Sequence, residues 1–180
     1  MARTRITRCT LHLHCRTLNT IAILTRLGVV RVTYMPKAIV RLELGRNSRR
    51  QSSIQPVPSF LAQFSRQLRA YARGQRVTWR VPLSLTTGTP FQRKVWRALR
   101  GIPHGETRSY AWVAGKIGRP HAVRAVGAAC GANPVPIIIP CHRVVYTNGS
   151  LGGFSAGLSW KRRLLHLERT KICSPRHHNE

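Results

Sequence analysis

The sequence predicts an α/β protein with two parts, and the distribution of its apolar residues supports this division. Between Thr20 and Leu44, three short runs of β-branched and aliphatic residues favour strands. From Thr89 onward, apolar residues recur mainly at intervals of three and four, which indicates helices. We therefore expect a small antiparallel sheet with one helix in residues 1–85, a mainly helical part in residues 89–172 and a tail in residues 173–180.

Turn-forming residues divide the first part into its elements. Gly28, Pro36 and Gly45 separate the three runs into a meander. Residues 47–59 are polar and contain proline, as expected of a loop, and residues 60–74 then show helical spacing that ends at Tyr71. The alternation of Trp79, Val81 and Leu83 predicts a further strand from Val77 to Leu85. No catalytic constellation is visible in residues 1–85, so we interpret this part as structural, with Ser84–Gly88 as the linker.

The second part begins with three predicted helices. Thr89 and Pro90 are a favourable N-cap and first helical residue, and Gly101 and Pro103 end this helix. Ser109 can cap a short helix to Ile117, and Pro120 is expected to open another after a turn at Gly118. Two short helices around a glycine turn have the outline of a helix-turn-helix. Arg119 and Arg124 project from the second helix, where a recognition element would present cations to DNA. The small residues of this helix would allow close approach to another backbone or to a groove: Ala122, Ala125, Gly127, Ala128 and Ala129. An ordinary two-helix packing unit would show the same pattern.

A cysteine and a histidine follow the most apolar run of the chain. Ile137, Ile138 and Ile139 predict a buried strand that Pro140 must end, since proline donates no hydrogen bond to a sheet. Cys141 would then lie at the edge of the core. A cysteine thiol is only slightly ionised at neutral pH and needs a base or a cation beside it, for which His142 and Arg143 are the candidates. The alternative is that Cys141 is an ordinary buried cysteine.

The last helix is predicted to place a carboxylate near this histidine. Before it, Tyr146–Gly157 form a glycine-dense loop without a phosphate-binding order, in which Phe154 offers a stacking face. Ser159 is expected to cap the helix, and Glu168 falls on its apolar face. A buried carboxylate needs a partner, and His142 would be oriented by it. A plain salt bridge from Glu168 to Arg143 or Lys161 is the alternative.

Composition indicates a folded protein that binds a polyanion. The chain has 180 residues, 42% of them hydrophobic, with 31 Lys and Arg against four acids and a formal net charge of +27. Such an excess attracts nucleic acid, although a basic ribosomal or chromatin protein would look similar. Five scattered cysteines favour a reducing compartment, so we expect a cytoplasmic protein in a bacterium or a nuclear one in a eukaryote.

Other partners and segments are not indicated. No apolar run reaches the length of a membrane span, so no membrane partner is expected. Cys9, His12, His14 and Cys15 match no zinc-module spacing, and we predict no metal. Residues 1–42 superficially resemble an acid-free organelle transit peptide, and whether residues 1–17 are ordered stays open.

Taken together, the motifs from about residue 90 to residue 168 resemble the C-terminal domain of the O6-alkylguanine-DNA alkyltransferases. The resemblance rests on five segments: FQRKVW, GETRSY, RAVGAACGANPVPIIIPCHRVV, LGGFSAGL and KRRLLHLE. It implies an RNase H-like antiparallel sheet joined to a domain with a winged-helix-like helix-turn-helix. It also implies DNA repair of O6-alkylguanine in double-stranded DNA, with one irreversible turnover, no cofactor and a monomeric protein.

The resemblance further implies roles for single residues. Cys141 would accept the alkyl group, His142 would take the thiol proton through a water, and Glu168 would orient His142. Tyr110 would protonate the leaving guanine, and Asn133 would link the recognition helix to the active-site segment. Arg124 would replace the flipped nucleotide in the base stack, and the recognition helix, with Ala125, Ala128 and Ala129, would enter the minor groove. The guanine edge would be read by backbone groups of Val144 and Ser155, beside Phe154, which stands where the family often has Tyr.

A second function stays open at this point. A basic helix-turn-helix protein or regulator, in which Cys141 is inert or acts as a sensor, would share most of these features. Presence of the acceptor cysteine separates the chain from the non-repairing relatives that lack it.

Overall fold

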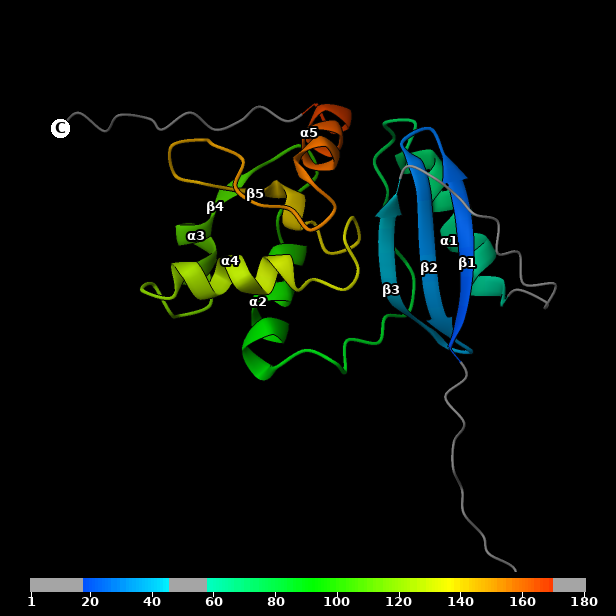
Figure 1. The fold of residues 1–180 in the computed structure, drawn as a ribbon, viewed down its shortest axis with the longest axis horizontal. Coiled ribbons are helices and arrows are strands. Elements are labelled where there is room, and N and C mark those ends of the chain that lie inside the picture. Colours follow the sequence, from blue (N-terminus) through cyan, green and yellow to red (C-terminus); the bar gives the residue numbers. More distant parts are fainter. Residues whose placement is uncertain (1–17, 46–57, 170–180) are drawn as a thin grey trace, which may run out of the picture.

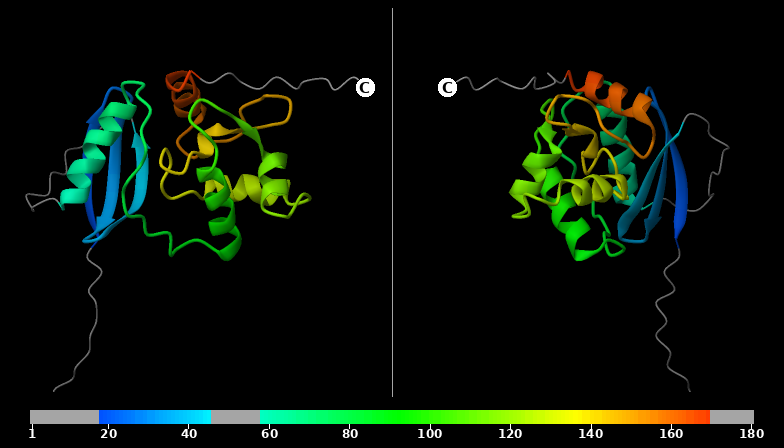
Figure 2. Two further views of the ribbon diagram at one scale, coloured as in Figure 1. Left: turned by 180° about the vertical axis from the view of Figure 1, so that it is seen from behind. Right: turned by 60° about the vertical axis from the view of Figure 1, so that its left-hand side comes forward.

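The computed structural model describes residues 18–45 and 58–169. Three antiparallel strands form a meander in the order β1 (Asn19–Thr25), β2 (Gly28–Met35) and β3 (Ala38–Gly45). Helix α1 (Ser59–Tyr71) lies along one face of this sheet, as Figures 1 and 2 show together. Its apolar stripe is buried because these residues share one face at helical spacing: Leu61, Phe64, Leu68 and Tyr71. The predicted meander and helix are confirmed, whereas most of the predicted 47–59 loop lies outside the described residues.

The predicted strand from Val77 to Leu85 is wrong. The segment is extended but pairs with β3 only around Ile39, through Ile39 N to Pro82 O (2.9 Å) and Ser84 N to Ile39 O (2.9 Å). Pro82 has no amide hydrogen, so it cannot extend this pairing into a ladder. The alternating apolar residues of this segment still pack against the core, as Trp79 and Leu83 do.

The second part is mainly helical and contains one short parallel strand pair. Its helices are α2 (Pro90–Arg100), α3 (Tyr110–Lys116), α4 (Val123–Gly131) and α5 (Leu158–Leu167), with a 3₁₀ turn η1 (Cys141–Arg143). Strands β4 (Arg108–Ser109) and β5 (Val144–Val145) pair in parallel, which the sequence did not indicate. Two predicted caps are confirmed: Thr89 Oγ1 accepts from Gln92 N (3.2 Å) and Ser109 Oγ accepts from Trp112 N (3.0 Å).

Two other predicted helix starts are wrong. Helix α4 begins at Val123 rather than Pro120, because the chain first makes a turn in which Ala122 N donates to Arg119 O (2.9 Å); proline suits such turns as well as helix starts. Helix α5 has Gly157 as its N-cap with φ +88°, and Ser159 makes no capping bond. A residue with a side chain would be strained at this positive φ, so glycine is favoured at the N-cap.

The apolar run before Cys141 is buried but is not a strand. Ile137, Ile138 and Ile139 are at most 5% exposed, yet the chain turns here, with Ile139 N donating to Val135 O (3.0 Å) and Ile137 at φ +75°. Prolines at positions 134, 136 and 140 remove the amide donors that a ladder would need. The β-branched residues of this run therefore indicate burial and not a strand.

The two parts share one hydrophobic core, and among the described residues one backbone hydrogen bond joins them. Strand β3, the edge of the sheet nearest the helical part in Figure 1, donates from Leu42 N to Pro134 O (2.8 Å). This bond attaches the sheet to the turn that precedes Cys141. Among the described helices, none is both long and apolar enough to cross a membrane.

Candidate active site

Cys141 lies at the start of η1, where an amide side chain holds its sulfur. The residue is 3% exposed, and Asn133 Nδ2 donates to its Sγ (3.1 Å) and to Ile139 O (2.8 Å). Asn133 Oδ1 accepts from Val135 N (3.1 Å), so all polar ends of this buried amide are used. The side chain thus fixes both the turn and the thiol.

Burial raises the pKa of the Cys141 thiol. The hydrogen bond from Asn133, the charge of Lys161 and the backbone amides of Cys141 and His142 oppose this rise. The thiol is therefore protonated at neutral pH, and these groups stabilise a thiolate once a base removes the proton.

His142 and Glu168 form a fully buried pair. His142 Nε2 lies 3.0 Å from Glu168 Oε1, and both side chains are 0% exposed. Glu168 also pairs with Arg143, whose Nε donates to Oε2 (2.8 Å) and whose Nη2 donates to Oε1 (2.8 Å). Both interpretations of Glu168, as partner of His142 and as salt-bridge partner of Arg143, are therefore present together. Lys161 does not contact it.

The pKa shifts of this pair give each member a definite state. Burial alone would raise the pKa of Glu168, but hydrogen bonds from His142 and Arg143 outweigh it and lower that pKa well below its ordinary value. The guanidinium of Arg143, which is always charged, contributes to this lowering. Burial lowers the pKa of His142 despite the Glu168 hydrogen bond. Its Nδ1 is buried and has no hydrogen-bond partner among the described residues. The neutral ring can thus accept a proton at Nδ1.

Three buried polar residues near the site make contacts that were not predicted. Arg143 was predicted as a candidate group beside the thiol and as an alternative partner of Glu168, but the bond from its Nη1 to Ile102 O (2.6 Å) was not predicted. Lys161 is 0% exposed and donates to Val144 O (2.6 Å) and Leu151 O; burial lowers its pKa to about 8. Tyr71, from α1, donates to Glu168 Oε1 (2.6 Å). A tyrosine on an apolar helix stripe was the only sequence signal for this contact.

A pocket of about 410 Å³ lies between α4 and the glycine-rich loop. Its lining residues are Tyr110, Val123, Arg124, Gly127, Gly131, Tyr146, Gly153, Phe154 and Ser155. Tyr110 packs against Tyr146 with 5.2 Å between ring centroids, and a Cβ at Gly152 would meet Tyr110 Oη at 2.7 Å. Glycine is thus required where the loop passes Tyr110. Burial raises the pKa of Tyr110, so its hydroxyl keeps its proton.

Most predicted DNA-facing positions are accessible, with one exception. Arg124, Ala125 and Ala128 are exposed on α4. Ala129 is only 2% exposed, and its carbonyl accepts from Trp96 Nε1 (2.8 Å), so the predicted contact of this residue with DNA is wrong. It follows Ala128 by about 100° around the helix and faces α2.

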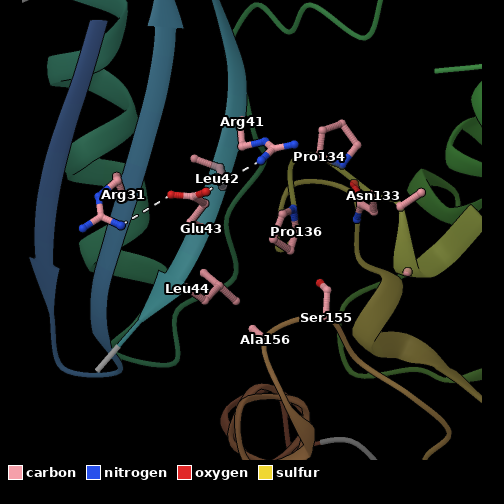
Figure 3. A pocket seen from close by; sticks show the side chains of 12 residues that line it. Arg31, Arg41, Leu42, Glu43, Leu44, Asn133, Pro134, Pro136, Ser155 and Ala156 are labelled. Atoms are coloured by element: carbon pink, nitrogen blue, oxygen red, sulfur yellow. Dashed lines mark hydrogen bonds and ion pairs between the residues drawn. The ribbon is translucent and has the colours of Figure 1, made fainter. Parts of the chain in front are cut away.

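A second hollow, of about 470 Å³, separates β3 from the Asn133–Pro136 turn and is drawn in Figure 3. Arg31 and Arg41 reach Glu43 there, at 3.4 Å and 3.7 Å. Gly131 and Ser155 line both this hollow and the Tyr110 pocket, so the two share a wall. No cluster of three metal-ligating side chains occurs within residues 18–45 and 58–169, and Cys9, His12, His14 and Cys15 lie outside them.

The fold and the site define an α/β protein with a buried cysteine followed directly by a buried histidine, which is paired with a buried glutamate. Comparison with known proteins agrees with this class. Residues 90–170 match the family described as 6-O-methylguanine DNA methyltransferase, DNA binding domain. The methylated-DNA–protein-cysteine methyltransferase of Mycobacterium tuberculosis is 41% identical over 150 residues, which cover 83% of this chain and 82% of the relative. The constitutive enzyme of that name from Bacillus subtilis is 50% identical over 110 residues, 61% of this chain and 66% of its own.

Solved structures give the same result. The crystal structure of M. tuberculosis O6-methylguanine methyltransferase matches with a TM-score of 0.73 and 38% identity, covering 85% of this chain and 93% of the other. The structure of M. tuberculosis OGT in complex with DNA matches with a TM-score of 0.73 and 39% identity, covering 83% and 92%. The chain therefore belongs to the methylated-DNA–protein-cysteine methyltransferase family.

Proposed function

We propose that this protein repairs DNA by moving an alkyl group from O6 of guanine to Sγ of Cys141. The observation that carries the proposal is that the buried Cys141 is followed in the chain by a buried His142, whose Nε2 is held by Glu168 and whose Nδ1 has no partner among the described residues. The family to which the chain belongs, and the names of its relatives, support the same reaction.

The chemistry balances without a cofactor. His142 Nδ1 takes the thiol proton, directly or across one water, and Glu168 stabilises the imidazolium that forms. The thiolate attacks the alkyl carbon, so that an S–C bond forms as the C–O6 bond breaks. The Tyr110 hydroxyl gives its proton to the leaving guanine. Because the product at Cys141 is a thioether with no leaving group of its own, each molecule acts once.

The DNA-binding part of the proposal concerns α3 and α4. We interpret them as a helix-turn-helix of the winged type, with Arg124, Ala125 and Ala128 at the minor groove and an RNase H-like sheet beside it. O6 faces the paired base inside a duplex, so the nucleotide must be flipped before the thiol can reach it. We propose that the flipped guanine enters the Tyr110 pocket, with Phe154 and Ser155 in its wall and the backbone of Val144 beyond it. Arg124, which also lines this pocket, would take the place of the flipped nucleotide in the base stack. A monomer suffices, since all these residues come from one chain.

A stoichiometric repair assay tests the function. The protein is incubated with a duplex that carries one O6-methylguanine, and the guanine restored is counted against the protein added. Repair at one lesion per protein molecule supports alkyl transfer. Binding of the duplex without loss of the lesion supports the alternative, a basic DNA-binding protein or regulator.

A further inference from the structure

Among the described residues of the first part, Tyr71 hydrogen-bonds to Glu168 of the proposed catalytic pair. Tyr71, the last residue of α1, donates from its hydroxyl to Glu168 Oε1 at 2.6 Å. The same oxygen lies 3.0 Å from His142 Nε2 and 2.8 Å from Arg143 Nη2. Gly105 N donates to the other oxygen, Oε2, at 3.2 Å. Glu168 is therefore held from several sides, and only Tyr71 among these donors precedes residue 86.

The ring of Tyr71 is fixed by its own surroundings. The residue is 1% exposed and packs between Trp79, at 5.6 Å between ring centroids, and His104, at 6.2 Å with an edge-on geometry. Burial raises the pKa of its hydroxyl, and the charge of Glu168 adds to this rise, so the group stays a donor over the working pH range. A rigid donor with a short bond to a carboxylate fixes the carboxylate in turn.

We propose that Tyr71 is a positioning residue for alkyl transfer, which holds the Glu168 carboxylate so that His142 presents Nδ1 to the thiol. This inference rests on the proposed function and extends it to the first part of the chain. The hydroxyl also shares the negative charge of Oε1 with His142. Its removal leaves more of that charge to the imidazole, which raises the pKa of His142.

The test is the variant Tyr71→Phe, which removes the hydroxyl and keeps the ring. The single-turnover rate of methyl transfer should fall about tenfold, as expected for a misplaced base, while affinity for the lesion duplex stays unchanged. The acidic limb of the pH–rate profile should move to higher pH, since the His142 pKa rises. Tyr34→Phe is the matched control: Tyr34 is a buried tyrosine of β2 whose hydroxyl does not bond to Glu168, and neither quantity should change.

A double-mutant cycle separates positioning from general stability. If Tyr71 acts through Glu168, Tyr71→Phe should cost no further rate in a Glu168→Gln background. A rate and profile equal to those of the parent protein, or an equal rate loss with and without Glu168, would overturn the inference. Absence of methyl transfer by the parent protein would instead refute the proposed function.

Discussion

His142 Nε2 and Glu168 Oε1 lie 3.0 Å apart in a site that solvent does not reach. Nε2 is committed to the carboxylate, and Nδ1 has no hydrogen-bond partner among the described residues, so Nδ1 is the nitrogen that would accept the thiol proton in the proposed reaction. Arg143 keeps the carboxylate ionised, so Glu168 orients the ring and does not compete for that proton. The pair therefore accounts for the orientation and the neutral state that the proposed base needs before the reaction starts.

Glu168→Ala should destabilise the protein strongly. It leaves the Arg143 guanidinium buried without its carboxylate, and breaking a buried ion pair in this way costs about 3–5 kcal/mol. Glu43→Ala is the matched control, because Glu43 pairs with Arg31 and Arg41 at side chains that are 42–61% exposed, where loss is expected to cost at most about 1 kcal/mol. Urea unfolding of both variants measures the difference. Equal losses in the free energy of unfolding would show that the buried ion pair contributes no more to stability than the exposed one.

The rate of alkyl transfer should resist mild acid. The pKa of His142 is lowered by burial, so the neutral, proton-accepting ring persists below the ordinary histidine value of about 6.5, and the rate falls only as pH drops through the folded pKa. The same shift gives a sign for stability: the unfolded chain gains the proton first, so stability conferred by neutral His142 is present above about pH 6.5 and is lost below it.

A pH series of single-turnover rates checks this expectation, with His166→Asn as control, since His166 is exposed on α5. The control should leave the profile unchanged. A rate that already falls between pH 8 and 7 would mean that another group accepts the thiol proton.

Arg124→Ala should slow repair of a duplex far more than transfer from free O6-benzylguanine. A free base needs no flipping, so only the duplex reaction depends on a side chain that replaces the extruded nucleotide. Arg119→Ala is the control: Arg119 is an exposed arginine in the turn before α4 and does not line the pocket. It should weaken DNA binding without a selective loss of duplex repair. Equal losses on both substrates for Arg124→Ala would contradict its role.

The site could be predicted where burial of one charged side chain required a partner for it. Glu168 stood on an apolar helix face and needed a partner, and His142, 26 residues earlier in the chain, was the nearest candidate with a chemical reason to be there. The partner of Tyr71 could not be predicted, because a tyrosine on an apolar helix face gives no indication of which acceptor its hydroxyl will meet. The acceptor, Glu168, lies 97 residues later in the chain. Lys161 was hidden for a similar reason, since its acceptors are backbone carbonyls, which no sequence pattern reveals.

The two wrong strand predictions have a common cause. Ile137–Ile139 and Val77–Leu85 are apolar or alternating, which are the marks of burial as well as of strands. Whether such a segment joins a ladder depends on donors and on a neighbouring strand, and prolines at positions 82, 134, 136 and 140 removed the donors. Ala129 shows the same limit for a helix: its small size fits both a groove and a close packing contact, and the indole of Trp96 decided between them.

The most direct test of the account is peptide mapping by mass spectrometry after reaction with O6-methylguanine DNA. The protein should gain one methyl group per chain, located on the peptide that contains Cys141, while Cys130, the other buried cysteine of the described residues, stays unmodified. Cys141→Ala should bind the same duplex and gain nothing. A methyl group on Cys130, or a folded, DNA-bound protein with an unmodified Cys141, would contradict the account.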